Sequence, residues 1–301
     1  MNPLQIFLRQ SIDYAGLFPP AGLDMPAAVA NYGVYRTGAD AWALGRFILP
    51  AARLDEFAAA LSGIAAIHSP GGAWPLAALA GPDLAGDLEL IARFNARRSD
   101  ASTDTVELKA GTGAAIHDSM HRMPRHLQAY IEIPVDRDPA ALIDAISESG
   151  ARAKIRTGGV TRDAFPEPRD LIRFMASCVR ARVRFKATAG LHHPVRADYR
   201  LTYEADSERG VMFGFLNLFL AAAFLRAGMD ERTAMQVLEE RSPRAFQVDD
   251  DAVTWRHHRL SPEELRSARE EVIISFGSCS FTEPMTELRA LSLLEGEVRQ
   301  A

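Results

Sequence analysis

The sequence has 301 residues, of which 48% are hydrophobic and 24% charged, and its formal net charge is −5. This composition excludes a mainly disordered chain, and the sequence pI of about 5.9 argues against a generic binder of nucleic acid or of an anionic membrane surface. Two domains would fit the length, but α/β barrels reach this size as one unit, so we predict a single domain over residues 1–301.

Eight short apolar runs are typical of strands, and amphipathic stretches with a helical period separate them. In chain order, the predicted strands are Ile12–Ala15, Arg46–Pro50, Pro75–Ala80, Thr105–Lys109, Gln128–Pro134, Ala153–Thr157, Arg184–Thr188 and Val272–Phe276. The predicted helices lie near Met25–Arg36, Leu54–Leu61, Asp83–Ala96, Ala114–Met120, Pro139–Ser149, Pro168–Ala181 and Val211–Ala227, with a last one after Thr282. Eight alternating units without a dinucleotide glycine fingerprint favour an α/β fold of the (β/α)8 TIM barrel type.

Two segments are longer than the connections that a minimal (β/α)8 barrel needs. A polar loop, His192–Arg209, follows the seventh strand on the face where active-site lids lie. An extended connection between the seventh helix and the eighth strand, Met229–Glu270, is predicted to hold a helix, a hairpin around Phe246–Trp255 and another helix on the opposite face. The helix Val211–Ala227 has no polar face, which predicts either a homo-oligomer contact or cover from this connection.

The ends and the cysteines of the chain suggest a compartment. The N-terminus lacks a basic region followed by a long apolar stretch, so we expect no signal peptide. The apolar run Val211–Leu225 is too short to span a bilayer. Cys178 and Cys279 lie far apart and have no metal-ligand spacing, so a cytoplasmic location with no membrane partner is the expectation.

Lysine is rare in this sequence, and its positions are informative. Lys and Arg together number 34, but only Lys109, Lys154 and Lys186 are lysines. Arginine serves as well as lysine on a solvated surface, but it cannot supply a deprotonatable amine. Each of the three lysines falls near the carboxyl end of a predicted strand, where TIM-barrel enzymes hold their active sites.

Strand parity brings these lysines together with other polar groups. Alternate residues of a barrel strand point inward, and the apolar Val106 and Leu108 should face the helices. The same parity turns further side chains into the barrel: Glu107, Lys109, Glu132, Lys154, Arg156, Lys186 and Thr188. Six ionisable groups on four consecutive strands predict a polar pocket, and the alternative is a set of buried salt bridges that fills the barrel centre.

The strand Phe185–Leu191 resembles the strand that carries the Schiff-base lysine in the deoxyribose-phosphate aldolase family. It has a lysine, a hydroxyl residue two positions on, a glycine four positions on and then an apolar residue. Lys154 with Gly158 and Gly159 is similar to the second lysine strand of that family, although the order of the two strands is reversed here. The resemblance covers roughly fifteen residues, and it implies a barrel with reactive lysines while leaving the substrate open.

The residue types suit lyase chemistry through a lysine imine. A deprotonated amine attacks a carbonyl, and burial together with a neighbouring cation lowers an amine pKa toward neutrality. We therefore expect Lys186 to be the nucleophile, with Lys154 and Arg156 as the neighbouring cations; Lys154 as nucleophile is the alternative. Glu107 or Glu132 would move protons, and Lys109 belongs to the same catalytic group. Arg156 is suited to a substrate carboxylate or phosphate and Thr188 to a bound water, so the substrate is expected to be a small anionic carbonyl compound.

Loops at the same face complete the predicted site. At most one of the adjacent His192 and His193 should enter the pocket. Small residues after the eighth strand, including Ser278 and Ser280, predict anion binding by exposed backbone N–H groups. Further substrate-binding candidates are Asp13, Gly158 and Gly159.

Two other functions compete with the imine. In the first, a metal-assisted lyase or isomerase, Asp13, Glu107 and Glu132 would hold Mg²⁺ or Mn²⁺. In the second, the barrel only binds a small molecule and catalyses nothing. The imine interpretation itself requires no cofactor and no metal, and it expects a small-molecule substrate, no nucleic-acid partner and a homo-oligomer.

Overall fold

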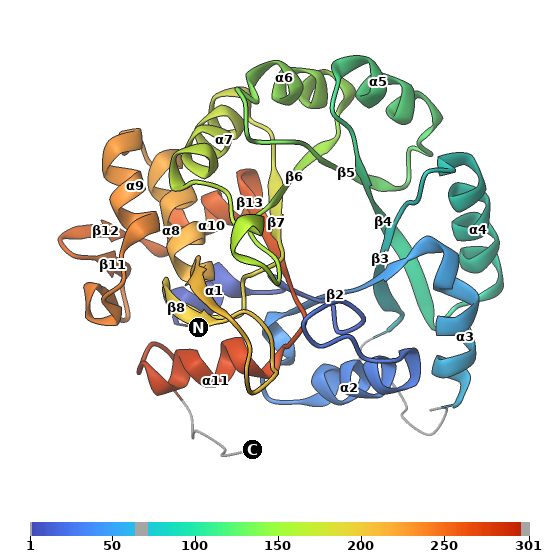
Figure 1. Ribbon diagram of the computed structural model, residues 1–301, viewed down its shortest axis with the longest axis horizontal. Coiled ribbons are helices and arrows are strands. Elements are labelled where there is room, and N and C mark those ends of the chain that lie inside the picture. Colours follow the sequence, from blue (N-terminus) through green and yellow to red (C-terminus); the bar gives the residue numbers. More distant parts are fainter. Residues whose placement is uncertain (1, 64–71, 296–301) are drawn as a thin grey trace.

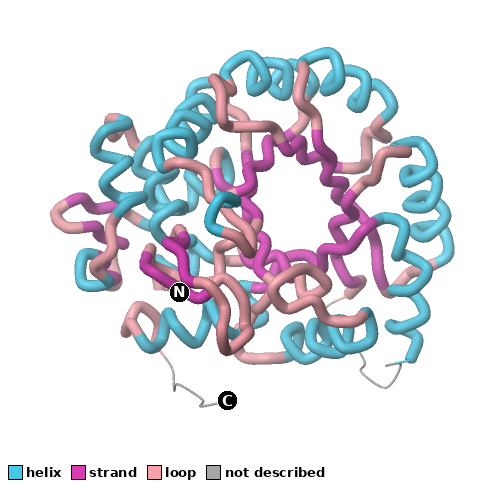
Figure 2. Tube along the Cα trace, in the orientation of Figure 1, coloured by secondary structure: helices cyan, strands magenta, loops and turns pink. Residues whose placement is uncertain are grey.

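The computed structural model describes residues 2–63 and 72–295. Eight parallel strands close into a barrel, and helices surround it (Figures 1 and 2). Around the barrel, the strands follow the order β1 (Ile12–Tyr14), β13 (Ile273–Ser278), β7 (Phe185–Thr188), β6 (Arg152–Arg156), β5 (Gln128–Glu132), β4 (Ala101–Lys109), β3 (Trp74–Leu79) and β2 (Leu44–Pro50). The prediction of a (β/α)8 TIM barrel is confirmed, and each predicted barrel strand overlaps one of these eight.

The helices also match the predicted pattern. The outer helices are α2 (Met25–Thr37), α3 (Leu54–Gly63), α4 (Leu84–Arg97), α5 (Gly113–Arg122), α6 (Ala140–Ser149), α7 (Pro168–Ala181), α8 (Phe215–Arg226) and α11 (Thr282–Ala290). A short helix, α1 (Pro3–Leu8), was not expected from the sequence; its capping box is formed by Asn2 and Gln5. No helix of the described residues is long and apolar enough to cross a membrane.

The two long connections differ in how well the sequence predicted them. After β7, the predicted loop His192–Arg209 instead contains a two-stranded hairpin, β8 (Ala197–Arg200) and β9 (Arg209–Met212). Because β9 takes up residues 209–212, the helix expected from Val211 begins only at Phe215. The second connection has the expected content, namely α9 (Glu231–Glu239), a small sheet of β10 (Phe246–Val248), β11 (Val253–Trp255) and β12 (His258–Leu260), and α10 (Pro262–Glu271).

Helix α8 is completely enclosed. All its residues from Phe215 to Leu225 are buried, and α7, α9 and α10 contact it together with β13. In Figure 1, α9 and the strands β11 and β12 lie on the outer side of α8. Its one polar side chain before the last residue, Asn217, donates to the carbonyls of Val237 and Glu240, both at 2.8 Å. Cover from the long connection therefore explains the missing polar face, whereas a homo-oligomer stays a prediction.

Candidate active site

Four site residues lie at one level of the barrel because of strand register. Lys109 pairs with Glu132, Glu132 with Lys154, and Lys154 with Lys186 in the ladders that join β4, β5, β6 and β7. Glu107, two residues before Lys109, points inward with the same parity. The alternation of the sequence thus places Glu107, Glu132, Lys154 and Lys186 in the barrel interior, as predicted, while Lys109 reaches its rim with a side chain that is 75% exposed.

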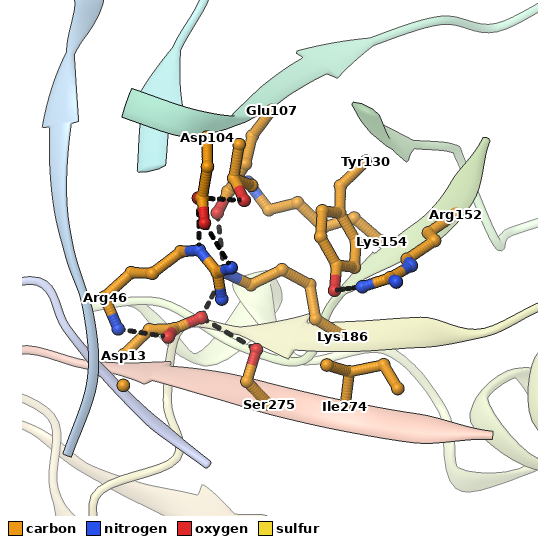
Figure 3. A network of polar contacts seen from close by, with 12 residues as sticks. Asp13, Arg46, Asp104, Glu107, Tyr130, Arg152, Lys154, Lys186, Ile274 and Ser275 are labelled. Carbon is orange, nitrogen blue, oxygen red and sulfur yellow. Dashed lines mark hydrogen bonds and ion pairs between the residues drawn. The ribbon is translucent and has the colours of Figure 1, made fainter. Parts of the chain in front are cut away.

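Six charged groups form one continuous series of ion pairs, which we call the ion-pair series. Lys186 Nζ lies 2.6 Å from Asp13 Oδ2 and 2.6 Å from Glu107 Oε1. Lys154 Nζ lies 2.8 Å from Glu107 Oε2 and 2.9 Å from Glu132 Oε2. Lys109 Nζ ends the series 3.4 Å from Glu132 Oε1. Figure 3 shows Lys186 between Asp13 and Glu107, with Lys154 on the other side of Glu107.

The charges of this series stabilise one another. Burial alone would lower the pKa of Lys186, but Asp13 and Glu107 outweigh burial and raise it. Burial would likewise lower the pKa of Lys154, and here Glu107 and Glu132 raise it. For Glu107, burial acts to raise the pKa, but Lys154 and Lys186 lower it to about 2. The expectation that neighbouring cations would lower the amine pKa of Lys186 is therefore wrong, because carboxylates are its nearest charged partners.

Open space begins at the outer part of the series. A cavity of about 270 Å³, which we call the main cavity, lies at the carboxyl ends of the strands and is lined by Glu107, Lys109, Glu132 and Lys154. A side cavity of about 430 Å³ is lined by the same four residues together with the loop after β3. Lys186 is only 1% exposed and lines neither cavity. The prediction that all three lysines open onto one cavity thus holds for Lys109 and Lys154 and is wrong for Lys186.

The rim of the main cavity carries most of the other predicted residues. Arg156, Thr188, Gly159 and His192 line it. Arg156 is exposed and has no ion pair within the part of the chain that the structure describes. Burial lowers the pKa of His192 to about 4, with a smaller effect from His193, so this imidazole is neutral at pH 7. Cys279 lines the same cavity, and burial raises the pKa of its thiol.

Several predicted substrate-binding residues lie outside the main cavity. Asp13 is buried and accepts from Arg46 N at 2.8 Å and Ser275 Oγ at 2.7 Å in addition to Lys186. His193 turns away, because its Nδ1 lies 2.6 Å from Glu287 Oε1 and its ring stacks on Tyr199.

The remaining three candidates have local structural contacts. Gly158 lies under Phe165: a Cβ at this position would come within 2.4 Å of that ring. The Ser278 hydroxyl is 3.4 Å from His192 Nδ1, and Ser280 Oγ accepts from Glu283 N at the start of α11.

Three residues of the barrel interior were not found from the sequence: parity could have found Arg46 and Ser275, whereas Asp104 lies at a break in the register of β3 and β4. Arg46 of β2 forms an ion pair with Asp104 of β4 at 2.7 Å (Figure 3). Ser275 of β13 holds Asp13. Arg46 and Ser275 lie within predicted strands, and each occupies one of the alternate positions that point into the barrel.

The carboxylates proposed for a metal already have cationic partners. Asp13, Glu107 and Glu132 each have a lysine ammonium at 2.9 Å or less, so a Mg²⁺ or Mn²⁺ ion bound by all three would have to displace Lys154 and Lys186. The donor set is suited to a divalent ion, but its arrangement around two ammonium groups is not.

The arrangement is that of a pocket with buried ion pairs at its inner end and the exposed cations Lys109 and Arg156 at its rim, on the face where TIM-barrel enzymes carry out their chemistry. The chain matches no protein-family model, no curated protein and no solved structure, so the geometry of the site carries the functional argument.

Proposed function

We propose that this barrel is an aldolase-like lyase that acts on a small anionic carbonyl compound through an imine on Lys154. The observation that carries the proposal is the position of Lys154. Its Nζ touches two carboxylates at 2.8 and 2.9 Å, and its side chain lines both the main cavity and the side cavity. Lys186 has a similar pair of carboxylates but no access to either cavity.

The covalent step balances with the groups that are present. The ammonium of Lys154 first passes a proton to Glu132 or Glu107, and the free amine then adds to the substrate carbonyl carbon. The carbonyl oxygen leaves as water after taking up two protons, so ammonium and carbonyl together give iminium and water. If the substrate has a hydroxyl group on its β-carbon, the bond between the α- and β-carbons breaks, its electrons move into the iminium to give an enamine, and the hydroxyl proton goes to a carboxylate.

The rim of the main cavity suits an anionic substrate. Lys109 and Arg156 both line the cavity, Lys109 with its side chain 75% exposed. Arg156 can bind a carboxylate or phosphate through two parallel hydrogen bonds. With Lys154, these side chains give the cavity three cations against two carboxylates.

A second candidate follows from the raised pKa of Lys154. In the empty site its proton lies on nitrogen, so Lys154 could act as an ammonium that stabilises an enolate, without a covalent bond. The two candidates predict opposite pH dependence. The rate of imine formation should increase with pH through about pH 9, because it needs the deprotonated amine. An ordinary lysine has a pKa near 10.4, and the pKa of Lys154 is raised. Stabilisation by the ammonium weakens as pH rises toward that pKa.

The decisive experiment is reductive trapping. The full-length protein is incubated with a panel of 2-oxo acids and phosphorylated hydroxyaldehydes, reduced with borohydride and mapped by mass spectrometry. We expect added mass on Lys154 and none in Lys154→Arg, whereas Lys109→Arg, a variant at the same cavity, keeps the adduct. Mass on Lys186 would reverse the assignment of the two lysines.

The same panel separates the other candidates. Turnover without a trapped adduct would reject the imine and favour the ammonium mechanism. Turnover abolished by chelators would favour the metal alternative. Binding without turnover or adduct would identify a non-catalytic small-molecule-binding barrel.

A further inference from the structure

A second polar cluster lies outside the ion-pair series, where the loop after β7 meets α11. It consists of His193, Glu283 and Glu287. One ligand atom from each residue can be chosen so that all three lie within 4.8 Å of one another. Glu283 and Glu287 are four residues apart on α11, so they project from one face of the helix, and His193 approaches that face from the loop.

The imidazole is held in place for ligation. The His193 ring stacks on Tyr199 with centroids 3.5 Å apart and an interplanar angle of 11°. Its Nδ1 points to Glu287 Oε1 at 2.6 Å. Glu283 is oriented in turn by Tyr203, whose hydroxyl donates to Glu283 Oε2 at 3.1 Å. Second partners of this kind fix the orientation of metal-binding side chains in known sites.

Charge in the cluster is unbalanced. Among residues 2–63 and 72–295, neither Glu283 nor Glu287 has an ion pair with a lysine or an arginine. This differs from the ion-pair series, in which every carboxylate has a lysine ammonium. Of the two half-buried carboxylates only Glu287 contacts the imidazole, and a divalent cation bound by all three side chains would balance the negative charge.

Space for an ion and its remaining ligands is present beside the cluster. A cavity of about 220 Å³, which we call the hairpin cavity, is lined by His193, Glu283, Tyr203 and His192. His192, whose side chain is 6% exposed, lines this cavity as well as the main cavity, and its Nδ1 lies 3.4 Å from the Ser278 hydroxyl. A metal-bound water in this cavity would lie among the polar side chains of His193, Tyr203 and Glu283.

We propose that His193, Glu283 and Glu287 bind a divalent transition-metal ion, with Zn²⁺ as the best match, and that the ion's open position faces the hairpin cavity. Histidine nitrogen and carboxylate oxygen both bind zinc, and three protein ligands with room for a water match the coordination of an open zinc site. Tetrahedral ligands at zinc bond lengths lie roughly 3.4 Å apart. The 2.6 Å contact between His193 and Glu287 must therefore widen by about 0.8 Å, and a separation at the 4.8 Å limit must shorten by about 1.4 Å. This site is independent of the proposed imine at Lys154.

The test is metal binding by the full-length protein after removal of metal with a chelator. Co²⁺ is the spectroscopic probe and Zn²⁺ the calorimetric one. We expect one equivalent to bind, visible absorption bands of nitrogen- and oxygen-bound Co²⁺, and a higher Tm in the presence of Zn²⁺. Glu287→Gln and His193→Gln should each weaken binding at least 10-fold, because even second partners of metal ligands contribute that much.

The matched control is Glu263→Gln, an exposed glutamate in the first turn of α10, which should bind like the unaltered protein. Equal affinity in all four proteins, or no Co²⁺ binding at millimolar concentration, would overturn the proposal. Preference for Mg²⁺ over Co²⁺ and Zn²⁺ would also overturn it, because it would exclude the imidazole as a ligand.

Discussion

The inner and outer ends of the ion-pair series contain the same kinds of group in different surroundings. At the inner end, Lys186 is 1% exposed and lies between Asp13 and Glu107 at 2.6 Å. At the outer end, the Lys109 side chain is 75% exposed and lies 3.4 Å from Glu132. Lys154 lies between the two ends, with buried ion pairs on one side and a cavity on the other.

This comparison separates structural charge from reactive charge. A lysine buried between carboxylates stabilises the centre of the barrel, because each buried charge is costly without its partner of opposite charge. Such a lysine does not reach a cavity where a substrate could bind. A lysine at the rim can bind an anion but has little effect on folding. Of the three lysines, Lys154 alone combines buried ion pairs with a place in the cavity lining, and four substitutions or conditions test the proposed division.

The largest effect is expected from Lys154→Arg. The variant keeps the positive charge and removes a usable nucleophile, so turnover of a trapped substrate should fall by about 10³-fold or more. Circular dichroism should show an intact fold. Lys109→Arg, at the outer end, should retain most of the activity; if both variants were equally inactive, the outer end would share the reactive role.

Lys186→Met tests the inner end through stability. Removing the ammonium takes a buried cationic partner from Asp13 and Glu107. Breaking a buried ion pair in this way lowers the free energy of unfolding by about 3–5 kcal/mol. Urea unfolding should show the loss, and adding Asp13→Asn should recover part of it. A loss below about 1 kcal/mol would mean that the inner end does not depend on its ion pairs.

Acid should destabilise the protein through Glu107. Its pKa is about 2 in the folded protein, below the value of about 4.3 in an unfolded chain. The stabilisation it provides is therefore complete above about pH 5 and is lost progressively as pH falls through the unfolded-state pKa toward 2. In Glu107→Gln, the free energy of unfolding should depend less steeply on pH in this window, because about one proton fewer is taken up on unfolding. An unchanged slope would show that Glu107 titrates normally.

The smallest effect on stability is expected from Lys109→Met. The side chain is largely solvated, so the free energy of unfolding should change by no more than about 0.5 kcal/mol. Its loss should instead raise KM for an anionic substrate, with a smaller effect on kcat. A large loss of stability would place Lys109 in the same class as Lys186.

The sequence predicted the barrel because its information is local. Short apolar runs alternate with amphipathic stretches, and strand parity alone turned Glu107, Lys154 and Lys186 inward. Misassignments occurred where tertiary contacts override the pattern. The apolar character of Val211–Met212 suggested helix, but these residues pair with Ala197 and Asp198 as a strand.

Sequence by itself therefore determined the fold class, the eight strands and most of the charged side chains that enter the barrel, because these follow from periodicity along one chain segment. Tertiary structure decided which inward charges meet and which of them reach solvent. Asp13 and Lys186 are 173 residues apart, and only barrel closure and strand stagger bring their charged atoms within 2.6 Å. The pKa of a buried amine depends on such partners across the barrel, so a lysine expected to be the free nucleophile proved to be a sealed ammonium.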